Sequence, residues 1–140
     1  MLNKLRSYLP GKWGQTKPVV PVVRLSGAIG AASPLKSGLN LSGVEDALQA
    51  AFSFKEAPAV AFSINSPGGS PVQSHLIFKR IRQLADQNNK QILVFVEDVA
   101  ASGGYMIALA GDDIIVDPSS IIVSIGVEPA GFGCTELLEK

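Results

Sequence analysis

The stretch that decides the fold is "VEDVAASGGYMIALAG", residues 96–111. It overlaps a near-continuous apolar run, "QILVFVED" (91–98), which predicts a buried strand. "SGGYMIALAG" then predicts a helix, with Gly111 as its C-cap. Ser102 lies at the junction, between two alanines and two glycines. A lone hydroxyl between a buried strand and an apolar helix has no use in a plain core, so this junction is the first candidate site.

Outward from this junction, strands and helices alternate along the chain. The strand at 18–25 contains Pro21 and is therefore expected at a sheet edge. The loop "NSPGGS" separates a buried strand, "AVAFSIN" (59–65), from a helix that begins at about Pro71. The other expected features are a helix that starts after Asn40 or Ser42, an apolar stripe of Ile77, Ile81, Leu84 and Ala85 on the helix after Pro71, and short strands in "DIIV" and "IIVSIGV".

This alternation predicts an α/β fold of right-handed βαβ units with a mostly parallel sheet. Because the strands are apolar on both faces, we expect both faces of the sheet to be buried. Ligands of such sheets bind outside the carboxyl ends of the strands. The loops "NSPGGS" and "DVAASGG" both lie at such ends, which predicts that they share one site.

The composition fits one globular domain: 140 residues, 46% of them hydrophobic, with 12 basic and 12 acidic side chains. Zero net charge gives no electrostatic support for nucleic-acid binding. Cys134 is the only cysteine, which excludes an internal disulfide and favours a reducing compartment. We expect neither a metal site nor a cofactor.

Residues 1–17 are expected to form a flexible basic segment in front of an α/β domain at 18–140. Leucines at helical spacing alternate there with basic residues: Leu2, Leu5 and Leu9 with Lys4, Arg6 and Lys12, followed by Trp13. The pattern suits a weak anchor on an anionic membrane surface or, as the favoured alternative, a frayed basic terminus. No stretch has the length of a transmembrane helix, and no signal-peptide core appears. We expect a cytoplasmic protein, with peripheral contact to the inner membrane as an option.

The "NSPGG" turn offers free backbone amides at the end of a strand. Pro67 keeps Ser66 out of helical space, and Gly68 and Gly69 allow positive φ and close approach of another group. A helix start behind such a turn adds the positive end of its dipole, which is how an oxyanion hole is built from backbone alone. The alternative, equally weighted from this motif alone, is a plain tight turn.

Ser102 occupies the equivalent point one βα unit later. The amide of Gly103 is expected to point to where the Ser102 hydroxyl reacts, completing a two-donor hole with Gly69. The alternative is that Ser102 is a helix N-cap. Capping needs no small residues on both sides, whereas a substrate backbone that comes close does.

Three motifs together resemble the signal peptide peptidase A family of serine peptidases: "INSPGGS", "VAASGGYMIALAGDDIIVDPSS" and "SIGV" with "GFGCTELLEK". The likeness runs from about Val19 to the end of the chain. It implies a crotonase-like, Clp-protease-like fold, a Ser–Lys dyad and cleavage of peptides at or near membranes. By position, it makes Ser102 the nucleophile and Gly69 and Gly103 the oxyanion amides, and it makes Ser124 the hydroxyl that orients the lysine.

The chain departs from the family pattern at the residue that serves as the catalytic base. Clp proteases use a histidine after the serine, but His75 is the only histidine here and is expected at the surface or in a groove. The family's lysine lies several tens of residues beyond the serine, and Lys140 is the only lysine after Lys90. Val123 also stands where the family usually has glycine. Because "TELLEK" ends in mid-helix, we expect a truncated chain; a naturally short, inactive member is the alternative.

The resemblance therefore implies a serine endopeptidase that cleaves hydrophobic peptides, such as remnant signal peptides, with a lysine base beyond this chain and a homo-oligomeric assembly. A catalytically inactive peptide-binding or scaffold member of the same fold is the first alternative. An acyl-CoA enzyme of the crotonase type is the second, and it fits less well because such enzymes use acidic residues near the hole.

Overall fold

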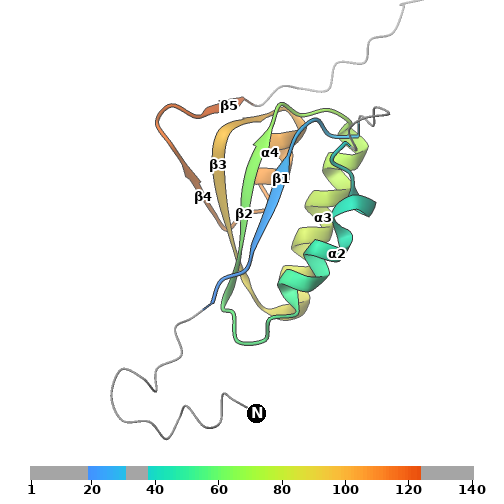
Figure 1. Ribbon diagram of the computed structural model, residues 1–140, viewed down its shortest axis with the longest axis vertical. Helices are drawn as coiled ribbons and strands as arrows, with labels where there is room; N and C mark the ends of the chain where they lie inside the picture. Colours follow the sequence, from blue (N-terminus) through green and yellow to red (C-terminus); the bar gives the residue numbers. More distant parts are fainter. Residues whose placement is uncertain (1–18, 31–37, 124–140) are drawn as a thin grey trace, which may run out of the picture.

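The computed structural model describes residues 19–30 and 38–123 and forms a parallel sheet with helices on one side (Figure 1). The elements in chain order are β1 (Val22–Ser26), α2 (Leu41–Phe52), β2 (Ala59–Ser66), α3 (Pro71–Asn88), β3 (Gln91–Ala101), α4 (Gly103–Ala108), β4 (Asp113–Val116) and β5 (Ile121–Val123). The sheet order is β1-β2-β3-β4, and β5 also pairs with β3. All pairs are parallel, which confirms the predicted α/β class.

The helices begin where local sequence signals place them. Asn40 caps α2 by accepting a hydrogen bond from the Gly43 amide at 2.9 Å. Ser70 caps α3, and Pro71 occupies the first helical position, where its missing N–H is not needed. The expected C-cap of α4 is wrong by two residues: the helix ends at Ala108 with Leu109 as its C-cap. Gly111 instead lies where a β-carbon would be 2.9 Å from Val94 Cγ2.

The core lies between the helices and one face of the sheet. The predicted stripe of α3, which is Ile77, Ile81, Leu84 and Ala85, is buried throughout. It packs on the inward residues of the strands, among them Phe62 and Val94, which are almost fully buried. Burial of this apolar surface is the main stabilising contribution to the fold.

The expectation that both sheet faces are buried is wrong for the described residues. In β1, exposed and buried positions alternate, and the outward Val22 is 67% exposed. The outward Arg24 continues this face through the residues in register with it, of which Phe95 and Ile115 are each 42% exposed. The helices described here cover only the opposite face (Figure 1).

β3 is longer than the sequence predicted, and this extension positions the site. It runs to Ala101 instead of ending near Asp98, because β5 pairs with its residues 99–101. Its pairing with β2 shifts between Ile64–Val96 and Ser66–Ala100, so β3 carries a bulge around Glu97. "DVAA" is therefore a strand and not a loop.

Replacing the buried Phe62 with alanine should lower the free energy of unfolding by about 4 kcal/mol, because it removes a ring from the core and leaves a cavity. The measurement is denaturant unfolding of the chain. Phe54→Ala is the matched control, since Phe54 is 52% exposed, and it should cost far less. Equal losses in the two variants would contradict this core.

Glu45 joins α2 to α3 and should make the fold sensitive to acid. The Arg80 guanidinium donates to both of its carboxylate oxygens, at 3.0 and 3.1 Å, and this hydrogen bonding, with a further one from Gln49, holds the pKa of Glu45 below its usual value. A lowered folded-state pKa contributes stability at neutral pH that is lost as pH falls through it.

Glu45→Gln should therefore flatten the decline of unfolding free energy between about pH 5 and about pH 2. Denaturant midpoints across that range measure it. Glu56→Gln serves as the control, because Glu56 is exposed and forms no ion pair within the described part of the chain. An identical pH slope in all three proteins would show that the Glu45–Arg80 pair has no such role.

Candidate active site

Ser102 forms a strained corner between β3 and α4. Its φ is +50° and its ψ is −115°, a combination that residues other than glycine rarely adopt. Its amide donates to the Val123 carbonyl at 3.0 Å, and its carbonyl accepts from Met106 at 3.0 Å, so the backbone is held on both sides. In α/β-hydrolases, the nucleophilic serine lies on a strained strand-to-helix turn.

The Ser102 side chain does not cap α4. Although it precedes the first helical residue, its hydroxyl makes no capping hydrogen bond. The plain alternative for this residue, a helix cap, therefore fails in the structure. The half-buried hydroxyl is left for another partner.

The "SPGG" turn is locked by a buried serine. Ser66 is fully buried, donates to the Gly27 carbonyl at 2.7 Å and accepts from the Gly68 amide at 3.2 Å. Gly68 and Gly69 have φ of +98° and +145°, which only glycine adopts easily. A β-carbon on Gly69 would lie 2.2 Å from the Ile29 carbonyl oxygen, so Gly69 has a structural need for glycine as well.

The two predicted motifs meet at the carboxyl ends of β2 and β3. A β-carbon on Gly68 would be 2.8 Å from Ser102 Cβ and 3.0 Å from the Gly103 nitrogen. The turn therefore packs directly on the Ser102 corner. This placement is what the strand-end rule led us to expect.

The glycines after Ser102 have a different reason from the one the sequence suggested. A β-carbon on Gly103 would lie 2.2 Å from the Ser74 hydroxyl oxygen, and one on Gly104 would lie 2.7 Å from the Ser66 carbonyl oxygen. Both glycines are buried against the protein's own α3 and β2. Their small size serves packing of α4, and approach of a substrate backbone is not needed to explain them.

The amides assigned to the oxyanion hole are available within the described residues. Neither Gly69 N nor Gly103 N donates a hydrogen bond to another residue in 19–30 or 38–123. Gly69 is exposed, and Gly103 opens the first turn of α4, where amides have no helical partner. That both amides point to one position beside the Ser102 hydroxyl stays a prediction.

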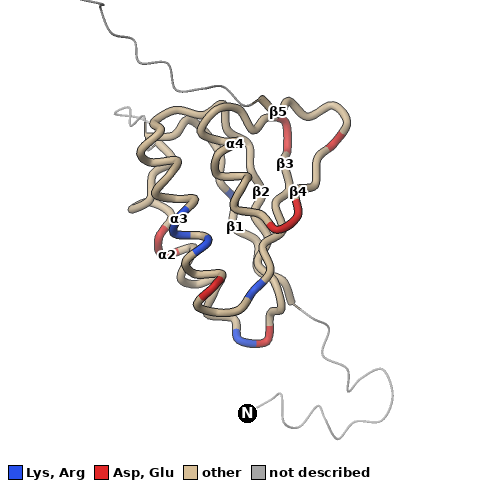
Figure 2. The backbone as a smooth tube through the Cα atoms, turned by 180° about the vertical axis from the view of Figure 1, so that it is seen from behind, with Lys and Arg blue, Asp and Glu red and all other residues tan. Residues whose placement is uncertain are grey.

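No described lysine or histidine stands beside Ser102. Lys90 lies at the amino end of β3, where its ammonium donates to the Phe54 carbonyl, and Lys55 lies in the loop before β2. Lys79 is exposed in the middle of α3, and the exposed His75 stacks on Phe78 with ring centroids 6.4 Å apart. Figure 2 shows the described basic residues on α3, on β1 and toward the amino ends of the strands.

Acidic side chains near the bulge of β3 are engaged in the sheet. Glu97 accepts from Ser63 and from Arg24, the latter at 2.7 Å, and these bonds hold the pKa of Glu97 below its usual value, the Ser63 bond most strongly. Asp98 accepts from Asn65 at 2.8 Å. Glu97 therefore fastens β3 to β1 and β2, and Asp98 fastens it to β2.

Several predicted features lie outside the described residues. These are Ser124, the basic segment 1–17, Cys134 and Lys140. Among the residues that are described, no helix is long and apolar enough to cross a membrane.

Two serines that sequence reasoning passed over form part of this site. Ser66 and Ser74 are both fully buried and hold the turn and the start of α4. A signal for each was present, because Ser66 shares the inward parity of Phe62 and Ile64, and Ser74 continues the buried stripe of α3. A small polar residue at a core position indicates close packing or a local hydrogen bond.

A hollow of about 460 Å³ lies between α2 and α3. It is lined by Asn40, Leu41, Ser42, Glu45, Gln73 and Leu76. Ser102 is not among these residues, so the hollow is separate from the strand-end site.

The sequence is similar to proteins named as peptidases and to one named as an antiporter. Residues 84–140 match the model of Peptidase family S49. The chain is 38% identical over 86 residues to the chloroplastic serine protease SPPA of Arabidopsis thaliana, a match that covers 61% of this chain and 12% of that protein. It is 57% identical over 137 residues to a Na(+)/H(+) antiporter NhaA of Brucella melitensis, covering 97% of this chain and 19% of that protein. The chain thus spans about a fifth or less of these relatives.

A solved structure shares the fold. A membrane-bound stomatin-specific protease, in a serine-to-alanine mutant form, superimposes with a TM-score of 0.56 over 77% of this chain and 48% of that chain, at 24% identity. At that identity the likeness concerns the fold alone. It confirms the expected Clp-protease-like α/β architecture.

Strain at Ser102 predicts an unusual order of stability among variants. Because glycine tolerates a φ of +50°, Ser102→Gly should be more stable than Ser102→Ala by about 1 kcal/mol. Denaturant unfolding of the two variants measures this difference. At Ser26, an exposed residue of β1, the same pair should show the opposite order, since glycine ordinarily weakens a strand. If alanine is the more stable residue at 102 as well, the corner is not strained.

Proposed function

Because the chain is a relative of the serine peptidases of family S49, we propose that it carries the nucleophile of a serine endopeptidase. The observation that supports this most is the Ser102 corner, which is strained and whose hydroxyl does not cap α4. It packs on a turn in which the Gly69 amide has no partner among the described residues. A purely structural serine at a helix start is expected to cap the helix instead.

In the proposed reaction, Ser102 Oγ attacks the carbonyl carbon of a peptide bond and gives its proton to a neutral lysine amine. The negative charge that develops on the carbonyl oxygen is stabilised by the amides of Gly69 and Gly103. The C–N bond then breaks, and the leaving amine takes the proton from the lysine. Water attacks the resulting ester with the lysine again as base, which releases the acid and restores the serine.

We place the lysine of this dyad in sequence that follows residue 140. Within the described residues, the lysines lie far along α3 or at the opposite ends of the strands. Burial would have to lower the pKa of such a lysine for it to act as a base. The Ser124 hydroxyl is proposed to orient it. Support for that role comes from the preceding residue, because the Val123 carbonyl accepts the Ser102 amide at 3.0 Å.

Hydrophobic peptides, such as remnant signal peptides, are the proposed substrates. The strand beside the corner presents an aliphatic surface, since Ile121 is 59%, Ile122 38% and Val123 39% exposed. Such a surface suits apolar side chains of an extended peptide. We further propose a homo-oligomer in the cytoplasm, with contact between segment 1–17 and the inner membrane as the less favoured alternative to a frayed basic terminus.

A chain extended through the downstream lysine tests the function with a fluorogenic hydrophobic peptide. Ser102→Ala should lower kcat/KM by about a thousandfold or more, as loss of a catalytic nucleophile usually does. Ser26→Ala is the matched control, because Ser26 is an exposed serine at the carboxyl end of the neighbouring β1, and it should retain full activity.

Two results would overturn the proposal. Full activity of Ser102→Ala would show that another residue is the nucleophile. If the unmodified extended chain binds the peptide but never cleaves it, the inactive peptide-binding alternative is correct.

A further inference from the structure

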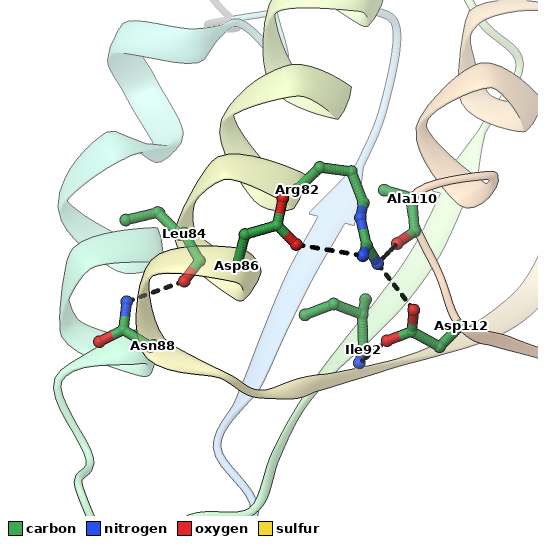
Figure 3. Close-up of polar contacts among 7 residues, drawn as sticks. All are labelled: Arg82, Leu84, Asp86, Asn88, Ile92, Ala110 and Asp112. Carbon is green, nitrogen blue, oxygen red and sulfur yellow. Dashed lines mark hydrogen bonds and ion pairs between the residues drawn. The ribbon is translucent and has the colours of Figure 1, made fainter.

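An arginine of α3 holds the end of α4 that lies farthest from Ser102. Arg82 Nη1 donates to the Ala110 carbonyl at 3.1 Å and to Asp112 Oδ1 at 2.8 Å (Figure 3). Ala110 is fully buried and follows the last turn of α4. A guanidinium has enough donors in one plane to hold both acceptors at once. Arg82 therefore links α3 to the chain that leaves α4.

Asp112 extends this link to the beginning of β3. Its Oδ2 accepts from the Ile92 amide at 2.7 Å, and its own amide donates to the Ile92 carbonyl at 2.8 Å. The Ile92 hydrogen bond, followed by the Arg82 pair, holds the pKa of Asp112 below its usual value, so the carboxylate stays charged at neutral pH. α3, β3 and the exit of α4 thus meet at one ion pair.

The same helix α3 also fixes the beginning of α4. Ser74 fills the space beside Gly103 so tightly that a β-carbon there would lie 2.2 Å from its hydroxyl. α4 has only six residues between these two contacts, and Ser102 comes directly before it. A short helix fixed at one end only can pivot about that end. Fixing both ends on α3, whose first turn carries the "SPGG" loop, prevents this motion.

We propose that Arg82 and Asp112 are positioning residues that fix the orientation of α4, and with it the Gly103 amide relative to Ser102. The effect on catalysis rests on the proposed peptidase function, whereas the effect on the amide does not. Neither side chain touches the Ser102 corner, so both act through α4.

The test compares two arginines of the same helix. Arg82→Gln breaks the contacts with Ala110 and Asp112 and also the ion pair with Asp86 one turn along α3. Arg80→Gln breaks the ion pair with Glu45 on α2. In the isotope-labelled 140-residue chain, the amide NMR signals of Ser102, Gly103 and Gly104 should move in Arg82→Gln and stay in place in Arg80→Gln. If Arg82→Gln lowers the melting temperature as much as Arg80→Gln does but leaves these three signals unchanged, the proposal is overturned.

A milder variant keeps the test decisive if Arg82→Gln does not fold. In Asp112→Asn the side-chain oxygen can still accept the Ile92 amide, but the ion pair with Arg82 at this position is gone, while the ion pair between Arg82 and Asp86 remains. The same three signals should move, by less than in Arg82→Gln. A spectrum that changes only around Ile92 would contradict the proposal.

Kinetics of the extended chain separate this inference from the proposed function. Arg82→Gln should lower kcat about tenfold with KM changed less than twofold, because misalignment weakens transition-state contacts more than ground-state binding. Arg80→Gln should keep both constants. If the extended chain shows no peptidase activity, the proposed function fails while the NMR result still decides the positioning role. Activity with an equal loss of kcat in both arginine variants would overturn the positioning role alone.

Discussion

The carboxyl ends of β2 and β3 can pack against α4 only because residues 103 and 104 have no side chains. At these two positions the hydroxyl of Ser74 and the carbonyl of Ser66 occupy the space that a β-carbon would take. α4 therefore starts directly against α3 and β2. The sharp corner at Ser102, its contact with the "SPGG" turn and the path of α4 away from the sheet all depend on this close approach.

Local signals predicted the kinds of elements and most of their beginnings. Pro71 at the start of α3 and Asn40 before α2 act within one turn of helix, so their effect is visible in a short window of sequence. The end of β3 was predicted wrongly for the converse reason. Residues 99–101 are strand because β5 pairs with them, and a partner 22 residues away in the chain, as Ile121 is from Val99, leaves no mark on local composition.

In the candidate site, too, the features that follow from the order of the elements could be predicted, and those that depend on tertiary packing could not. That Ser102 and the glycine turn lie together follows from a rule about the ends of parallel strands, which needs only the element order. The contacts made by Ser66 and Ser74 depend on how α3 and α4 pack, which no motif specifies. The outward face of the sheet was misjudged because large apolar residues such as Phe95 and Ile115 lie on it. The clear alternation of exposed Arg24 and Ser26 with buried residues, which marks an uncovered face, is confined to the short strand β1.

The parallel pairing has a consequence for how the chain folds. Val22 pairs with Ala61, and Ala61 pairs with Leu93, so each ladder closes only after an entire intervening helix has been gathered in. Contacts this distant in sequence make folding slow. The backbone of Ser102 is held by β5 and by the turn after β2, so its strained geometry cannot exist before those elements have assembled. An unfinished chain consequently carries this serine in a relaxed conformation, and the strained geometry belongs to the assembled fold alone.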